Sequence, residues 1–254
     1  MRAIATRVMT FMTLLLAAIF AASTTAAQAP LVFPSAMGEV RIFPLGHASL
    51  RLEVGNLIVH VDPWSNVTDY ASQPDAGLVL VTHEHQDHLD PAALEQVVGE
   101  GTLVVMDAFS AGRYAGEATV LANNESLEFE GMRVTAVPAY NLVQVRDDGT
   151  PYHPEGNYNG YLIDVADVRV HIGGDTECVP EFDDLGELGE GGGVDVSFLP
   201  INLPFTMPPE DAAECFRRIS PTVAVPYHQG EADPQVVADL LADSGIDVRV
   251  LALP

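Results

Sequence analysis

The feature that most constrains this chain is the run Thr-His-Glu-His-Gln-Asp-His-Leu-Asp at residues 82–90. The apolar residues 78–81 before it predict a short buried strand, and residues 91–98 after it predict a helix. Asp90 can cap that helix, and Pro91 can occupy its first turn. The cluster is therefore expected on a strand-to-helix loop that is held rigidly at both ends.

Imidazole and carboxylate side chains in the pattern His-x-His-x-Asp-His are suited to zinc, iron or manganese. His83 and His85 are two residues apart, so on an extended segment they project to the same side and can reach one ion. The adjacent Asp87 and His88 lie at the turn and can point towards a second ion. An ordinary polar surface loop is disfavoured, because this pattern would seldom arise by chance from the composition of the chain.

Residues 1–29 have the layout of a secretory signal peptide. Arg2 and Arg7 precede an apolar run at residues 8–20, and small residues follow through Ala29. A membrane anchor is the alternative, but the run is short for a membrane span. We therefore expect an exported protein, periplasmic or secreted, with one domain over residues 30–254 and no stable membrane association after the signal is cleaved.

The chain is strongly acidic, with 36 Asp and Glu against 11 basic residues, all of them Arg. Two of these Arg residues and none of the acids lie in residues 1–29. The rest therefore carries 9 positive and 36 negative charges, a formal net charge of −27 with histidine neutral. Such a surface repels nucleic acid and anionic membranes. We expect a small-molecule substrate and no nucleic-acid partner.

Cys178 and Cys215 are the only cysteines. An exported protein is allowed a disulfide. A chain of this length needs no covalent staple, however, and Cys215 lies within a helical pattern. Two buried thiols are therefore expected.

Short β-rich runs dominate the remainder. Three of them, at 40–45, 48–54 and 57–61, are separated by turns that contain glycine, and residues 30–38 look like a lead-in. Further strands are expected at 102–106, 118–121, 126–130, 132–137, 159–165, 168–174, 194–200, 222–226 and 247–251, with helices at 107–115, 208–219 and 233–244. This order fits sheet layers with helices outside them, an α/β fold class.

Other residues with polar or ionisable side chains lie in a long loop or in predicted strands. Residues 138–158 include a polar loop, and loops of such length inside a compact domain are usually functional or disordered. Two glycines precede Asp175, so the backbone can turn tightly and let that carboxylate project from a strand end. His60 lies inside a predicted strand and is expected to be structural, and His171 lies in a predicted hairpin and is expected to pack or to lie at the surface.

The run at 82–90 resembles the signature of the metallo-β-lactamase superfamily, and other elements typical of that superfamily follow in order. Gly174-Asp175-Thr176 matches its Gly-Asp-Thr element, and His228, at a predicted strand end, matches its last metal ligand. Asp62 ends an apolar strand where the family has a carboxylate that supports the metal loop.

Two further elements are similar to the ascorbate-phosphate lactonase-like branch of that superfamily. One is Gly46-His47-Ala48-Ser49, although His47 can equally be interpreted as a turn histidine. The other is Ala139-Tyr140-Asn141 followed by His153-Pro154, which resembles a subset of lactonase-like hydrolases. The arrangement familiar from the superfamily has a metal-binding histidine directly after the strand that ends before residue 140. The present chain has Tyr140 and Asn141 at that place.

The resemblance runs from about Val40 to the C-terminus and implies a four-layer αβ/βα sandwich, α+β in its helix and sheet arrangement. It implies a set of metal ligands: His83, His85 and His153 for a first ion, Asp87, His88 and His228 for a second, and Asp175 between them. His47, Asp62, Tyr140 and Asn141 are expected to support the ligands or to border the cleft.

The implied reaction is hydrolysis by water activated at two divalent ions, with zinc as the default and manganese or iron as alternatives. Asp87 is the expected catalytic residue, since it would orient the attacking water and carry its proton. The branch makes a lactone, a phosphoester or a related ester the leading substrate class. Two alternatives stay open: an exported metallo-β-lactamase and a non-catalytic metal-binding module.

Overall fold

The computed structural model describes residues 29–188, 192–251 and 253. The predicted signal peptide therefore lies outside the described residues, except for its last position. No helix in the described part of the chain is long and apolar enough to cross a membrane.

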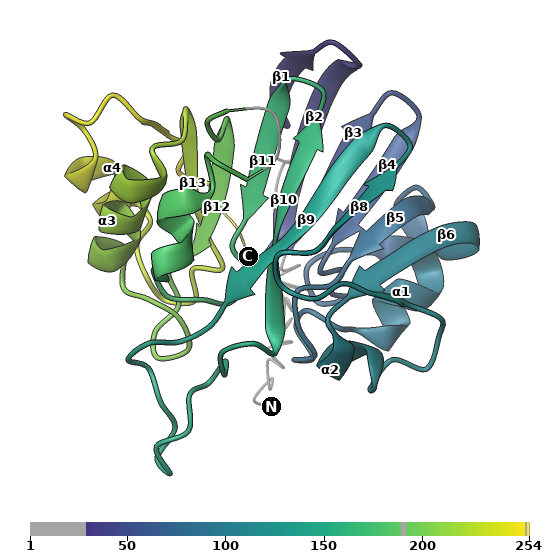
Figure 1. The fold of residues 1–254 in the computed structure, drawn as a ribbon, viewed down its shortest axis with the longest axis horizontal. Coiled ribbons are helices and arrows are strands. Elements are labelled where there is room, and N and C mark those ends of the chain that lie inside the picture. Colours follow the sequence, from purple (N-terminus) through teal and green to yellow (C-terminus); the bar gives the residue numbers. More distant parts are fainter. Residues whose placement is uncertain (1–28, 189–191, 252, 254) are drawn as a thin grey trace, which may run out of the picture.

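Two mixed seven-stranded sheets form the centre of the molecule (Figure 1). The first has the order β1-β2-β3-β4-β5-β6-β7, with β1 Leu31–Ser35, β2 Gly38–Gly46, β3 Ser49–Val54, β4 Leu57–Val61, β5 Ala76–Leu80, β6 Val98–Met106 and β7 Thr119–Val120. The second has the order β14-β13-β12-β11-β10-β9-β8, with β8 Ser126–Phe129, β9 Met132–Ala139, β10 Tyr158–Val165, β11 Val168–Ile172, β12 Val196–Pro200, β13 Val223–Tyr227 and β14 Asp247–Val248.

Helices cover the outer face of each sheet. The first sheet carries α1 (Pro91–Val97), α2 (Ala108–Ala111) and the 3₁₀ turn η1 (Tyr70–Ser72), and the second carries α3 (Pro209–Ile219), α4 (Gln235–Leu240) and the 3₁₀ turn η2 (Pro180–Asp184). The largest apolar cluster lies between the sheets, with Ile42 and Leu78 from the first and Ile163 and Phe198 from the second. Smaller clusters lie under α3 and under α1. The layers run helix, sheet, sheet, helix, which confirms the predicted αβ/βα sandwich.

The first strand corrects the interpretation of residues 30–38 as a lead-in. β1 pairs antiparallel with β2. Leu31 and Phe33 pack against the core between the sheets, whereas Val32 is 45% exposed. This alternation is that of an edge strand with one buried face. Pro34 interrupts the five-residue run and weakens its strand pattern in the sequence.

His60 and His171 are buried inside strands, and of the two interpretations of His171 its burial favours packing over a surface position. His60 Nε2 lies 3.1 Å from the carbonyl oxygen of Pro74, and His171 Nδ1 lies 2.8 Å from Ser197 Oγ. Burial lowers the pKa of His60 to about 4 and the pKa of His171 to about 3. Both rings are therefore neutral at pH 7 and serve as packing groups.

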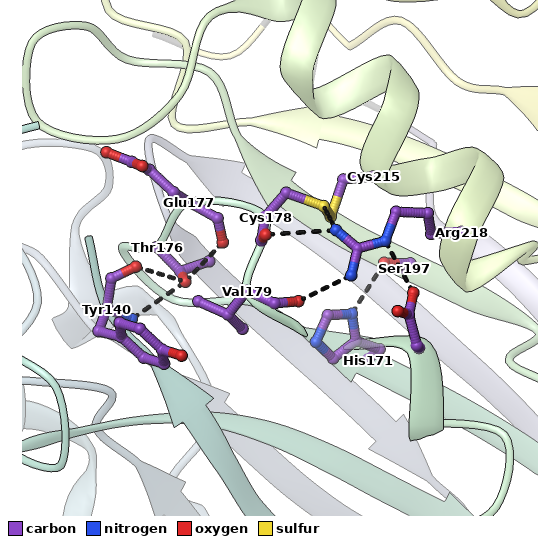
Figure 2. The surroundings of a disulfide bond; sticks show 10 residues. Tyr140, His171, Thr176, Glu177, Cys178, Val179, Ser197, Cys215 and Arg218 are labelled. Carbon is purple, nitrogen blue, oxygen red and sulfur yellow. Dashed lines mark hydrogen bonds and ion pairs between the residues drawn. A yellow bond between two sulfur atoms is a disulfide. The ribbon is translucent and has the colours of Figure 1, made fainter. Parts of the chain in front are cut away.

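Cys178 and Cys215 form a disulfide, which corrects the expectation of two buried thiols. Cys178 follows β11, and Cys215 lies on α3, where the two Cα atoms are 5.4 Å apart. Figure 2 shows Arg218 from the same helix beside the bond, where it donates to the carbonyl oxygen of Cys178 at 3.4 Å. The packing of α3 on the second sheet brings the two cysteines together across 37 residues of sequence.

Replacement of both cysteines by serine is expected to lower the free energy of unfolding by about 2–4 kcal/mol, because a cross-link restricts the unfolded chain. Urea denaturation of the variant and of the wild type, with and without a thiol reductant, measures the change. The reduced wild type should unfold at the same urea concentration as the variant. Equal midpoints for oxidised wild type and variant would contradict the expectation.

His171→Gln is expected to make the protein less sensitive to acid. In the folded chain the pKa of His171 is about 3, against 6.5 for an unperturbed histidine. On acidification the unfolded chain binds a proton at residue 171 before the folded chain does. The contribution of neutral His171 to the free energy of unfolding is therefore fully present above pH 6.5 and is lost as the pH falls towards 3. Between pH 7.5 and 5 the loss from one such histidine is about 2 kcal/mol. Urea titrations of the metal-free protein at the two pH values should show a smaller loss in the variant, and an unchanged loss would refute this account.

Candidate metal centre

The loop at residues 82–90 lies where β5 ends and α1 begins, as the sequence predicts. Asp90 caps α1 by accepting a hydrogen bond from Ala92 N at 2.9 Å, and Pro91 occupies the first turn. At the other end, Thr82 O accepts a hydrogen bond from Asn159 N at the start of β10. The loop is therefore fixed to its own helix and to the second sheet.

Asp62 holds the loop from beneath. It is fully buried at the end of β4, where its carboxylate accepts hydrogen bonds from Thr82 N at 2.8 Å and from Thr82 Oγ1 at 2.7 Å. Its Oδ2 also lies 2.8 Å from His88 Nδ1. A carboxylate at this nitrogen favours a proton on Nδ1, which leaves Nε2 of His88 with a lone pair for a metal.

The structure brings the seven predicted ligand residues together in three overlapping groups. Within each group the candidate ligand atoms lie within 4.8 Å of one another. The groups are His83, His85 and His153; His83, His88 and Asp175; and His47, Asp87, His88 and His228. Five of these side chains are almost completely buried: His83, His88, His153, Asp175 and His228.

Asp175 lies between two sets of imidazoles. Its Oδ2 is 3.4 Å from His153 Nε2 and 4.0 Å from His83 Nε2. Its Oδ1 is 3.4 Å from His88 Nε2 and 3.3 Å from His228 Nε2. Two ligands about 2.0 Å from one tetrahedral ion are about 3.3 Å apart, so these separations suit a shared cation.

Several of these atoms are buried without a hydrogen-bond partner among the described residues: Nε2 of His88, His153 and His228, and Oδ1 of Asp175. Buried polar atoms normally have a partner, and a set of unpaired atoms that face one another needs an explanation. A metal ion satisfies imidazole nitrogen and carboxylate oxygen together. The donor set therefore fits divalent metal.

Burial, together with the neighbouring histidines, holds the pKa of His83 and of His228 well below the usual value and lowers the pKa of His153 to about 2. These rings are neutral at pH 7, as metal ligands must be. Burial also acts on His88, but Asp175, Asp62 and Asp87 outweigh it and raise its pKa to about 9, so a metal ion that binds Nε2 must displace a proton from it. Burial raises the pKa of Asp175 to about 7.

His47 contacts the predicted catalytic carboxylate. Its Nε2 lies 3.0 Å from Asp87 Oδ2, and its ring centroid is 3.7 Å from that of His228. The His47 hydrogen bond and the charge of His88 outweigh burial and lower the pKa of Asp87. These contacts favour the interpretation of His47 as a residue of the site over its interpretation as a turn histidine.

Asn141 and Tyr140 differ in their positions. Asn141 Oδ1 accepts a hydrogen bond from His153 N at 2.7 Å and lies 2.9 Å from His153 Nδ1. Tyr140 instead packs in the cluster under α3, and its hydroxyl donates to Glu181 at 3.1 Å. The Asn141 side chain therefore contacts a candidate ligand, whereas the Tyr140 side chain contacts Glu181 and the apolar cluster under α3.

Other residues near the cluster carry no signal in the sequence. Asn202 Nδ2 lies 3.2 Å from His228 Nδ1. The Tyr158 ring centroid is 5.3 Å from that of His83, and its hydroxyl donates to Glu84 at 3.1 Å. The ring of Phe109, 6.2 Å from that of Tyr158, lines a cavity of about 350 Å³ between α2 and residues 156–159. These contacts depend on tertiary packing, so no spacing rule could have found them.

Helices cover the outside of two packed sheets, and a cluster of histidines and aspartates lies where strands of both sheets end. Together these features define a hydrolase of the metallo-β-lactamase fold. The family described as Beta-lactamase superfamily domain matches residues 41–228. The chain belongs to this superfamily.

Its relatives are metal-dependent hydrolases. A UPF0173 metal-dependent hydrolase of Methanopyrus kandleri is 32% identical over 227 residues, which cover 84% of this chain and 96% of the relative. A crystal structure described as a candidate metal-dependent hydrolase of Parabacteroides distasonis is 39% identical, with a TM-score of 0.81 over 89% of this chain and 99% of that one. A metallo hydrolase of Ignicoccus hospitalis, 22% identical with a TM-score of 0.65, covers 84% of this chain and 94% of its own and is similar in fold. The chain is accordingly a metal-dependent hydrolase.

Asp62→Asn is expected to weaken metal binding about 10–100-fold. The amide that replaces Oδ2 would donate to His88 Nδ1, so the ring proton would move to Nε2 and remove the lone pair that faces Asp175. Competition titration of the metal-free protein against a chromophoric chelator measures the affinity. Asp90→Asn, on the same loop, is the control and should change affinity less than threefold. Equal affinities for the two variants would contradict this role of Asp62.

Proposed function

We propose that this chain is an exported hydrolase of the lactonase-like branch that holds two divalent ions and acts on a lactone, a phosphoester or a related ester. The observation that carries the two-ion part is the position of Asp175. One of its oxygens faces His83 and His153, and the other faces His88 and His228. A carboxylate with each oxygen directed at a different imidazole pair is the arrangement of a bridging ligand.

In this proposal each ion has its own set of side chains. His83, His85 and His153 hold the first ion, and Asp87, His88 and His228 hold the second, with Asp175 shared. Zinc is the leading metal because imidazole dominates the donor set, and manganese or iron are the alternatives because two carboxylates belong to it. A pair of such ions would lower the pKa of water and polarise the bond under attack.

The chain's own residues would orient the reactants and move the proton. Asp87 is the candidate catalytic residue, because its side chain is 35% exposed while those of His88 and His228 are buried. Its carboxylate can accept a proton from the attacking water and transfer it to the leaving group. His47 is a positioning residue in this scheme, since its hydrogen bond to Asp87 Oδ2 fixes the direction of the carboxylate. The buried side chains of His88 and His228 exclude bulk water from the side of the cluster opposite the exposed Asp87 carboxylate.

The disulfide supports export. Disulfides persist in the periplasm and outside the cell and are rare in reducing compartments. The signal-type sequence at residues 1–29 agrees with that location. A fusion of residues 1–29 to a reporter that is active only after export tests this part of the proposal, and activity lost on deletion of residues 8–20 would support it.

The substrate class is tested by metal analysis of protein exported by its native host, followed by a screen on that same preparation. The panel holds a neutral lactone, a phosphodiester, a phosphomonoester and a chromogenic cephalosporin. Fast hydrolysis of a lactone or a phosphoester, with two metal ions per chain, is the expected result. Fast turnover of the cephalosporin alone would replace this proposal with an exported metallo-β-lactamase.

Asp87→Ala is expected to lower kcat by about 10²–10⁴-fold, because it removes the proton acceptor. It should also weaken the second ion more than the first. Steady-state kinetics and metal stoichiometry after dialysis measure the two effects. Asp148→Ala, on the exposed loop, is the matched control and should keep both metals and the wild-type rate. A near-normal rate with equal retention of both ions in Asp87→Ala would refute the assignment.

A further inference from the structure

The segment that carries His153 is unusual in its course. It leaves β9 at Ala139 and extends away from the sheets before β10 begins at Tyr158 (Figure 1). Its arms pair through a bridge between Val145 and Pro151 and a hydrogen bond from Arg146 N to Thr150 O at 2.7 Å. A candidate ligand thus lies on a projecting loop, where something must fix its position.

Glu177 supplies that fixation at the base of the segment. The residue is only 7% exposed, and its carboxylate accepts hydrogen bonds from three successive backbone amides. Leu142 N and Val143 N donate to Oε2 at 3.1 and 2.9 Å, and Gln144 N donates to Oε1 at 2.7 Å. Such a concave run of N–H groups is a binding site for an anion, and here the anion is a side chain of the protein.

The same carboxylate reaches His153 through Asn141. Asn141 Nδ2 donates to Glu177 Oε1 at 3.3 Å and to Phe205 O at 2.9 Å, and together these bonds orient the amide group with its oxygen towards His153. That oxygen accepts a hydrogen bond from His153 N and faces His153 Nδ1 at 2.9 Å. A proton held on Nδ1 leaves Nε2 free to bind metal, and this Nε2 is the buried atom without a partner that faces Asp175.

Glu177 is itself held on both sides. Two residues before it stands Asp175, and Glu177 N donates to Tyr140 O at 2.9 Å. Thr176 Oγ1 accepts a hydrogen bond from Tyr140 N at 3.1 Å. The residue after it is Cys178, whose disulfide fixes the segment to α3 (Figure 2). The carboxylate therefore projects from a rigid base.

We propose that Glu177 is a positioning residue that orders the loop from Asn141 to His153 before metal arrives and sets His153 for the first ion. The inference rests on the proposed role of His153 as a ligand. Ordering the loop in advance removes conformational entropy that would otherwise be lost on binding, and this raises the affinity for the metal.

The test uses Glu177→Gln in the full exported chain. The new amide nitrogen would face backbone N–H groups that need an acceptor, so at least two of the four hydrogen bonds are lost. Hydrogen exchange of the metal-free protein should show faster exchange at Leu142, Val143 and Gln144. Zinc titration against a chromophoric chelator should show first-ion affinity about 10–100-fold lower, with the second ion changed less than threefold. Glu181→Gln, which loses only the contact with the Tyr140 hydroxyl, should leave both measurements unchanged.

A double-mutant cycle with His153→Ala separates the possible outcomes. If Glu177 acts through His153, the double variant binds the first ion as His153→Ala alone does. Glu177→Gln with wild-type affinity, or with an equal further loss in the His153→Ala background, would overturn the inference and leave the proposed function intact. Unchanged affinity in His153→Ala alone would remove His153 from the proposed ligand set and the inference with it. Where Glu177→Gln yields too little folded protein, Glu177→Asp, which keeps the charge but shortens the side chain, gives the same comparison.

Discussion

Asp175 lies between imidazoles from both halves of the chain, and its distances of 3.3–3.4 Å to three of their nitrogens fall outside hydrogen bonds of good geometry. A buried carboxylate without close partners costs several kcal/mol. Positive charge in the space between the groups would offset that cost. Two neighbouring features, Asp62 under the loop and Asn141 beside His153, orient these rings for such a cation.

The backbone at the site is also held in an uncommon conformation. Among the described residues, seven non-glycine residues have positive φ, and three of them are His47, Asp62 and His228. Each stands at or just after the end of a strand, where a left-handed turn redirects the side chain towards the cluster. Such conformations cost about 1–3 kcal/mol each and persist only where the surroundings fix them. The two packed sheets provide that rigidity, and His228 N donates to His47 O at 3.1 Å, which links the two turns directly.

How much of the fold and of the candidate site could be predicted depends on the distance in sequence between interacting groups. The loop at 82–90 was predictable because its strand, its cap and its donor atoms stand in one short window. His153 could be proposed only through a family resemblance, because a projecting loop separates it from its strand. Glu177 and the disulfide could not be predicted, since tertiary packing brings their partners to them: the segment after β9 to Glu177, and α3 to Cys178. β1 was missed for a different reason: Pro34 obscures its alternation.

The negative charge of the chain and the positive charge of the proposed metal ions act in opposite ways on an anionic substrate. The body, at −27 over residues 30–254, repels anions, although salt confines that repulsion to about 8 Å at physiological ionic strength. Metal ions at the cluster would attract the same anions once they arrive. A phosphodiester would therefore meet repulsion on approach and attraction at contact, whereas a neutral lactone or ester would meet no repulsion and would still have its carbonyl polarised. Within the proposed substrate classes, the neutral ester bond is the one for which the surface and the site do not oppose each other.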